Sequence, residues 1–208
     1  NTSVGGSSLG ANITGNSLTA VGSNALLLNT ISGNTAVGAN AAYSNTSGRI
    51  DAFGTNAGFS NTTGNENIAF GQQNGYYAAL QNNTTGGSNV AFATGALGSN
   101  TTGSSNSAFG VAALYSNTTG TQNTAVGYQA GYNNTTGAVT SFGWRAGYSN
   151  TTGNIVAIGN SALLNSTTAT GIVAIGNSAG ESHTTQYGST YIGHVAGYNS
   201  TGQNLCIG

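Results

Sequence analysis

The sequence predicts an all-β fold, a parallel β-solenoid (β-roll) of about 12 coils, and three observations support it. A short apolar phrase that ends in Gly returns every 16 or 17 residues along almost all of the 208 residues. Within each phrase, side chains alternate with a period of two, as they do in a short strand. Turn residues such as Asn-Thr-Thr-Gly follow each phrase. A repeat of this length is too short for paired helices and is typical of one solenoid coil.

The residue that ends each phrase, which is Gly in every repeat but one, is here called the anchor and sets the register of the repeat. The anchors are Gly5, Gly22, Gly38, Gly54, Gly71, Ala93, Gly110, Gly127, Gly143, Gly159, Gly176, Gly193 and Gly208. The interval between Gly71 and Ala93 is 22 residues, which predicts a short insertion near 77–82. Residues 1–208 are therefore expected to form a single repeat array without a second domain. The array begins and ends inside a repeat, which favours a longer array or end-to-end stacking of subunits.

Two columns of the repeat predict how each strand is buried. The residue before the anchor is always large and apolar, from Val4 to Ile207, and is expected to form the core. The residue before that is usually Ala, a poor strand former, so a second surface is expected to pack against it. The predicted self-association face comprises Ala36, Ala52, Ala69, Ala91, Ala108, Ala125, Ala157 and Ala174. The alternative is that this alanine column simply fills a very thin coil.

The second half of each repeat is rich in turn residues. Asn caps its own backbone and Gly accepts a positive φ, so Asn-Thr-Thr-Gly predicts a corner of the coil. The same residues form N-glycosylation sequons, which leaves sugar attachment open at Asn61, Asn100, Asn117 and Asn150. An aromatic column precedes the corners, and stacked coils would turn it into a ladder. The ladder residues are Tyr43, Phe59, Tyr115, Tyr132 and Tyr148, which either close the end of the core or offer a surface for sugars.

The composition excludes several classes of function. With 2 Lys and Arg and 3 Asp and Glu in the whole chain, nucleic acid is not an expected partner. No catalytic, cofactor or metal residues are predicted, and the chain is not expected to be an enzyme. The Gly176–Gly180 match to a nucleophile elbow is accidental, because Ser178 belongs to a turn column. His183 and His194 fall in different columns, Cys206 is alone, and no apolar run is long enough to insert into a membrane.

The few charged residues are expected to make local contacts. Arg49 and Glu66 each lie five residues before an anchor in consecutive repeats, so they should stack on one face across one coil step. Arg145 follows Trp144, which predicts a cation–π contact.

The phrases Asn123–Gly137, Gly143–Gly153 and Ile155–Gly159 resemble the repeat arrays of phage tail-fibre and bacterial surface-adhesin proteins. Ile155-Val-Ala-Ile-Gly159 and Ile172-Val-Ala-Ile-Gly176 are also similar to the head repeats of trimeric autotransporter adhesins. This resemblance implies a left-handed parallel β-roll, three chains associated through their inner faces, and an extracellular rod on a cell surface or virion.

The expected function is therefore a structural fibre or adhesin segment that associates with itself, as a homotrimer or an end-to-end filament. Host-surface glycans or proteins are further expected partners. The alternative is a β-solenoid that binds ice or a polysaccharide surface through its threonine and asparagine columns. Adjacent threonines point to opposite faces of a strand, which makes a flat two-column threonine array harder to build.

Overall fold

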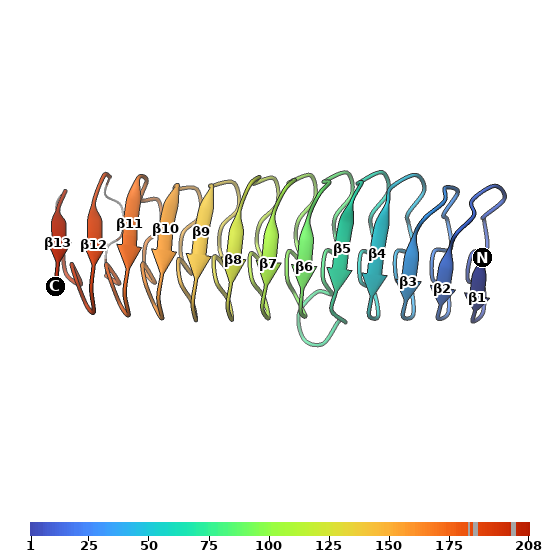
Figure 1. Ribbon diagram of the computed structural model, residues 1–208, viewed down its shortest axis with the longest axis horizontal. Coiled ribbons are helices and arrows are strands. Elements are labelled where there is room, and N and C mark those ends of the chain that lie inside the picture. The colour runs from blue at the N-terminus through green and yellow to red at the C-terminus, as the bar shows by residue number, and fades with distance from the viewer. Residues whose placement is uncertain (183, 185–186, 201–202) are drawn as a thin grey trace.

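The computed structural model describes residues 1–182, 184, 187–200 and 203–208, and it confirms the all-β prediction. Thirteen strands form one parallel sheet in which every strand pairs with its neighbours in sequence, giving a β-solenoid of about 12 turns (Figure 1). The strands are β1 (Thr2–Val4), β2 (Thr19–Val21), β3 (Thr35–Val37), β4 (Ile50–Phe53), β5 (Asn67–Phe70), β6 (Val90–Phe92), β7 (Ser107–Phe109), β8 (Thr124–Val126), β9 (Val139–Phe142), β10 (Ile155–Ile158), β11 (Ile172–Ile175), β12 (Thr190–Ile192) and β13 (Leu205–Ile207).

Each coil joins one short strand to a longer turn segment that returns behind the sheet (Figure 1). The turn segments are bonded to one another as the strands are, for example Leu114 N to Ala130 O at 3.0 Å. Positive φ values at alternate residues, such as 57° at Ala112 and 51° at Leu114, allow this wall to form without a second strand. The backbone of both walls is therefore hydrogen-bonded from coil to coil.

The interior is made of small residues, which overturns one prediction. The alanines two before the anchors have 0% exposure in a single chain, and they face a second buried alanine column on the turn wall that includes Ala113 and Ala146. The self-association face predicted at Ala36, Ala52, Ala69, Ala91, Ala108, Ala125, Ala157 and Ala174 is therefore wrong. The alternative interpretation, that alanine fills a thin coil, is the one that holds.

The large apolar column lies outside, which overturns the predicted core. Phe70, Phe92 and Phe109 are 44, 47 and 42% exposed, and none of the residues in this column is buried. Strand side chains alternate between two faces, so burying the alanines necessarily turns these larger residues outward. One coil holds a large ring in the alanine column: Tyr191, which pairs with Ala174, is fully buried, and Gly180 and Gly197 leave the space for its ring.

Buried asparagines form a ladder inside the corners of the coils. Asn100 Nδ2 donates to Asn83 Oδ1 at 2.7 Å, and Asn117 Nδ2 donates to Asn100 Oδ1 at 2.8 Å. The same Asn100 Nδ2 also donates to Gly103 O, which confirms that asparagine caps its own turn. Most of these amides thus close their own corner and bond to the neighbouring coil, whereas Asn150 closes only its own corner, and among the described residues Asn134 Oδ1 and Asn150 Oδ1 have no hydrogen-bond partner.

The extra residues lie earlier than predicted, at 74–78 rather than near 77–82. Gln73 N still bonds to Thr55 O in the usual register, and Ala79 N takes the place that Ala57 N has in the preceding coil. The loop protrudes beneath β5 and β6 in Figure 1. The array resumes its register at Ala79.

Candidate ligand-binding surfaces

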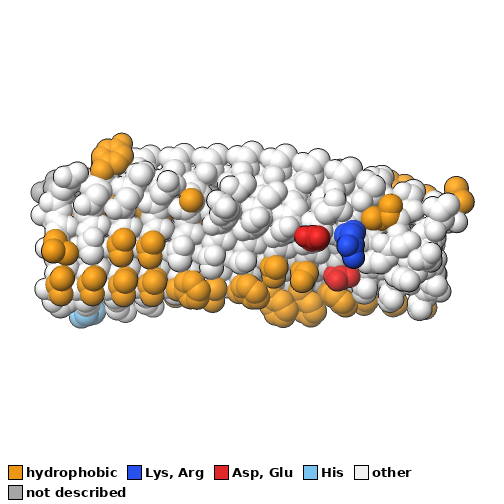
Figure 2. Space-filling view, turned by 45° about the horizontal axis from the view of Figure 1, so that its top comes forward, with side chains coloured by type: hydrophobic (Ala, Val, Ile, Leu, Met, Phe, Trp, Pro, Cys, Tyr) orange, Lys and Arg blue, Asp and Glu red, His pale blue; other side chains and the backbone are white. Residues whose placement is uncertain are grey.

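The exposed apolar column forms a continuous strip, here called the outer row. It comprises Val4, Val21, Val37, Phe53, Phe70, Phe92, Phe109, Val126, Phe142, Ile158, Ile175, Ile192 and Ile207. Hydrophobic side chains follow one edge of the molecule in Figure 2. The rings of Phe70 and Phe92 stack with centroids 4.6 Å apart and planes 6° apart. A groove of about 490 Å³ runs beside Phe53, Phe70 and Phe92.

The predicted aromatic ladder is present in two stretches. Tyr43 stacks on Phe59 with centroids 5.0 Å apart, and Tyr132 stacks on Tyr115 and Tyr148 at 5.2 and 5.1 Å. All five rings are half-buried. Burial raises the pKa of the Tyr132 hydroxyl, because the phenolate would lose hydration there.

The two stretches are separated by coils in which the ladder position holds Gln81 and Gly98. The inserted loop compensates for this gap. Tyr77 stacks on Tyr115 with centroids 5.7 Å apart and planes 16° apart. A Cβ built on Gly98 would lie 2.9 Å from Tyr77 Cβ, so the glycine leaves the space that the loop occupies. The sequence did not indicate this partnership, because Tyr77 and Tyr115 are far apart in the repeat alignment.

The loop also reaches the coil of β8 through a polar network. Gln129 Nε2 lies 3.3 Å from the hydroxyl of Tyr76, and Gln129 Oε1 accepts a hydrogen bond from Arg145 Nε at 3.0 Å. The Arg145 guanidinium lies over the rings of Trp144 and Tyr148, at 5.1 and 4.3 Å from their centroids. The predicted contact with Trp144 is confirmed. A hydrogen bond with Tyr76 raises the pKa of Tyr128, which places that ring in the same group.

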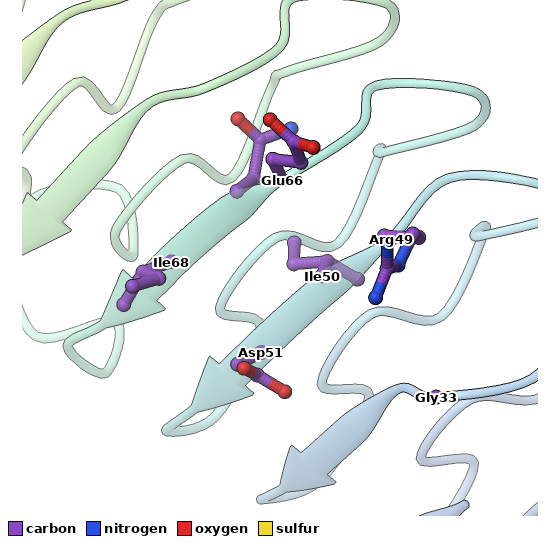
Figure 3. Close-up of a pocket in the computed structure, with 7 residues that line it drawn as sticks. Gly33, Arg49, Ile50, Asp51, Glu66 and Ile68 are labelled. Carbon is purple, nitrogen blue, oxygen red and sulfur yellow. The ribbon is translucent and has the colours of Figure 1, made fainter. Parts of the chain in front are cut away.

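The three charged residues around β4 line a shallow pocket of about 300 Å³ (Figure 3). Arg49 and Glu66 lie on the same face in consecutive coils, which confirms their shared column, yet they form no ion pair in the described part of the chain. Glu66 Oε2 instead accepts a hydrogen bond from Ser88 at 3.4 Å. With acidic and basic groups mixed and exposed, the pocket has no single charge to select a ligand.

The sequon asparagines lie inside the protein. Asn61, Asn100, Asn117 and Asn150 have 0% exposure. Their Nδ2 atoms donate to carbonyl groups of their own corners, as Asn150 does to Gly153 O at 2.7 Å. A glycan on Nδ2 would need space that the folded coil does not have. The interpretation of these four residues as glycosylation sites is therefore wrong for the folded chain.

The remaining sequence candidates do not gather into a site. Ser178 has a φ of 53° in a solenoid turn, and His183 lies outside the described residues. Among the described residues, no group of three His, Cys, Asp or Glu side chains is placed to hold a metal ion. No helix of sufficient length and apolarity to cross a membrane occurs in those same residues.

Comparison of the chain with protein-family models, curated proteins and solved structures gives no match.

Proposed function

We propose that this chain is a structural segment of an extracellular fibre or adhesin, on a cell surface or a virion, in which solenoids associate side by side along the outer row. The observation that carries the proposal is the exposure of that row, where Phe, Ile and Val replace the polar residues expected on a solvated sheet face. The chain has no proposed catalytic role.

The size of the outer row supports a second copy of the chain as its partner. Seven members, from Phe70 to Ile192, are each 38 to 47% exposed. At roughly 70 Å² for each such side chain, these seven together with the exposed Val4 and Ile207 leave roughly 600 Å² of apolar side chain in water, before the four less exposed members of the row are added. That area already reaches the upper end of about 300 to 600 Å² for the largest patch of a monomer, and a stable interface covers about 800 Å² on each partner. Side chains in the outer row recur at the spacing of the coils, so a second copy of the chain, which has the same spacing, can pack along the whole row.

The near absence of charge supports the same partner. Around the outer row the described residues carry one charged side chain in the strands, Asp51 on β4. A surface of this kind does not repel its own copy and offers little to a polyanion.

Ice binding through threonine is the weaker alternative. In the pairs from Thr62-Thr63 to Thr167-Thr168 the first hydroxyl donates to the next coil, as Thr101 Oγ1 does to Thr118 O at 3.0 Å. In these pairs only the second threonine, such as Thr102, is exposed. One exposed column does not make the flat two-column array that this alternative requires.

Sedimentation velocity over a range of protein concentrations tests the proposal. The wild-type chain is expected to sediment as an oligomer, and electron microscopy of the same sample should show rods wider than one solenoid. The triple variant Phe92→Thr, Phe109→Thr and Phe142→Thr should sediment as a monomer with an unchanged circular dichroism spectrum, because these side chains lie outside the core.

The matched control is Ile13→Thr, which removes an apolar side chain that is 92% exposed and lies away from the outer row. This variant should associate as the wild type does. A wild-type chain that stays monomeric at every concentration would overturn the proposal, as would a triple variant that still assembles.

A further inference from the structure

We propose that the surface around the inserted loop binds an acidic saccharide, in which a carboxylate lies beside a pyranose ring. This site, here called the loop site, comprises Tyr77, Tyr128, Trp144 and Arg145, positioned by Tyr76 and Gln129. The inference rests on the proposed adhesin function for its setting and names the ligand chemistry of one contact surface.

The loop site offers three aromatic rings to solvent. Tyr77, Tyr128 and Trp144 are 39, 43 and 44% exposed, although none of them belongs to the outer row. The C–H bonds on one face of a pyranose ring carry partial positive charge, and the face of an aromatic ring carries partial negative charge. Rings exposed in this way can therefore stack against sugars while their polar tips remain in water.

Arg145 supplies the charge that selects an acid. Its Nε is used by Gln129, and in the described part of the chain neither Nη group has a protein partner. Among the described residues no carboxylate forms an ion pair with it, whereas Arg49, the only other Arg or Lys side chain, shares its pocket with Asp51 and Glu66. A guanidinium held over aromatic rings presents its remaining donors as a fork, which matches the two oxygens of a carboxylate.

The geometry of the loop site is fixed before any ligand binds. Gln129 is only 6% exposed, and its two amide ends hold Tyr76 on one side and Arg145 on the other. Tyr76 itself packs over Gly95, where a Cβ would lie 3.0 Å from Tyr76 Cβ. Because the side chains are already ordered, a ligand would lose less free energy in ordering them.

The equivalent columns elsewhere lack this combination. Near β2 to β4 the column that holds Gln129 and Arg145 holds Asn24, Asn40 and Asn56, which bond to one another at 3.0 and 3.1 Å. The ladder beside them has Tyr43 and Phe59 but no basic side chain. That stretch of the surface is therefore a natural control within the same chain.

The test is a titration followed by the fluorescence of Trp144, the only tryptophan, and by calorimetry. The probes are 3′-sialyllactose and trigalacturonate, with lactose as the neutral sugar. At least one acidic probe should change the fluorescence and saturate, with at least tenfold higher affinity than lactose. Failure of both acidic probes to bind, or equal binding of lactose, would overturn the inference.

Variants separate the charge from the rings. Arg145→Gln should lower the affinity for the acidic probe at least tenfold and leave lactose unchanged. Gln is already accepted in that column at Gln129, with the same φ of 54°. Tyr77→Ala should weaken both sugars, and the control Tyr43→Ala should weaken neither. Unchanged acid binding by Arg145→Gln would remove the proposed role of the guanidinium.

Sedimentation of the same samples distinguishes the two proposals. Intact assembly without sugar binding would overturn the loop site alone. Sugar binding by a chain that does not assemble would overturn the proposed association and leave the loop site standing.

Discussion

The coils of β6 to β8 and those of β9 to β11 have the same outline but different interiors. Four residues before the anchor, the first group has Asn89, Asn106 and Asn123, and the second group has Val139, Ile155 and Ile172. All six side chains are buried. In the first group each side chain bonds to the next coil, as Asn106 Oδ1 does in accepting from Asn123 N at 2.9 Å. In the second group Ile155 N donates instead to the backbone oxygen of Ala138 at 3.2 Å, and the strands are four residues long rather than three.

The opposite wall adjusts to part of this difference. Leu97 and Leu114 follow the anchors in the asparagine coils, whereas Gly131 and Gly147 occupy that column next to Val139 and Ile155. The coil of β10 keeps a buried leucine there, Leu163. A Cβ on Gly147 would lie 2.9 Å from Ile155 Cδ1. The comparison shows that the coil keeps its interior filled while exchanging the residues that fill it. Hydrogen bonding is less complete in the second group, because among the described residues Asn134 Oδ1, Ser141 Oγ and Asn150 Oδ1 are buried without a partner.

The largest effect is expected from breaking the asparagine ladder. Asn106→Ala removes the Oδ1 that accepts from Asn123 N and Asn123 Nδ2. Asn89 Oδ1 keeps Asn106 N as a donor and Gly120 O keeps Asn117 Nδ2, so the groups that lose a partner are those of Asn123. Leaving buried polar groups unpaired should lower the free energy of unfolding by about 3 to 5 kcal/mol, measured by urea denaturation. The exposed control Asn177→Ala should change it by less than about 0.5 kcal/mol. An effect of Asn106→Ala as small as the control would contradict the ladder's structural role.

Overfilling the apolar coils should have the next largest effect. Gly147→Leu places a side chain against Ile155 and should cost about 2 to 3 kcal/mol of unfolding free energy. Because Leu97 and Leu114 accept φ values of 51°, the positive φ alone does not forbid leucine. Adding Ile155→Ala should recover part of the loss in a double-mutant cycle. Strictly additive effects would show that the two columns do not share volume.

The threonine hydrogen bonds between coils should contribute less to the free energy of unfolding, and the contribution should be the same in both regions. Thr101→Val and Thr151→Val each remove one hydroxyl that donates to the next coil at 3.0 Å. Each should lower the free energy of unfolding by about 1 kcal/mol in urea denaturation. A much larger loss at one site than at the other would show that the two regions differ at the corner as well as in the interior.

The smallest effect concerns alkaline pH. Burial raises the pKa of Tyr115 and Tyr132 above the ordinary value of 10.0, so the folded state favours the neutral phenols. Their contribution to stability is complete below that value and is lost as the pH rises through the folded pKa. Absorbance titration should show tyrosinate forming later in the native chain than in urea. Coincident titrations would contradict the burial of the ladder.

The sequence predicted the strands, the parallel register and the aromatic ladder, because each follows from a spacing that recurs. It did not predict which strand face is inside. Alternation places Ala91 and Phe92 on opposite faces of the strand but does not tell which face is buried. The space inside the coil decides that. The loop site was not predicted for a different reason. The contact between Tyr76 and Gln129 does not recur in other repeats, and it forms because Gly95 and Gly98 have no side chain in the space that the loop occupies.

The same loop changes how the molecule would respond to being pulled. In a solenoid, each coil is bonded only to its neighbours, so tension applied at the ends can peel coils away one at a time. The hydroxyl of Tyr76, in the loop after β5, accepts a hydrogen bond from Gln129, which follows β8. This bond therefore spans the coils that lie between them. Because this contact joins coils that are not neighbours, we expect the coils between Tyr76 and Gln129 to need more force to separate one at a time than the coils on either side of them.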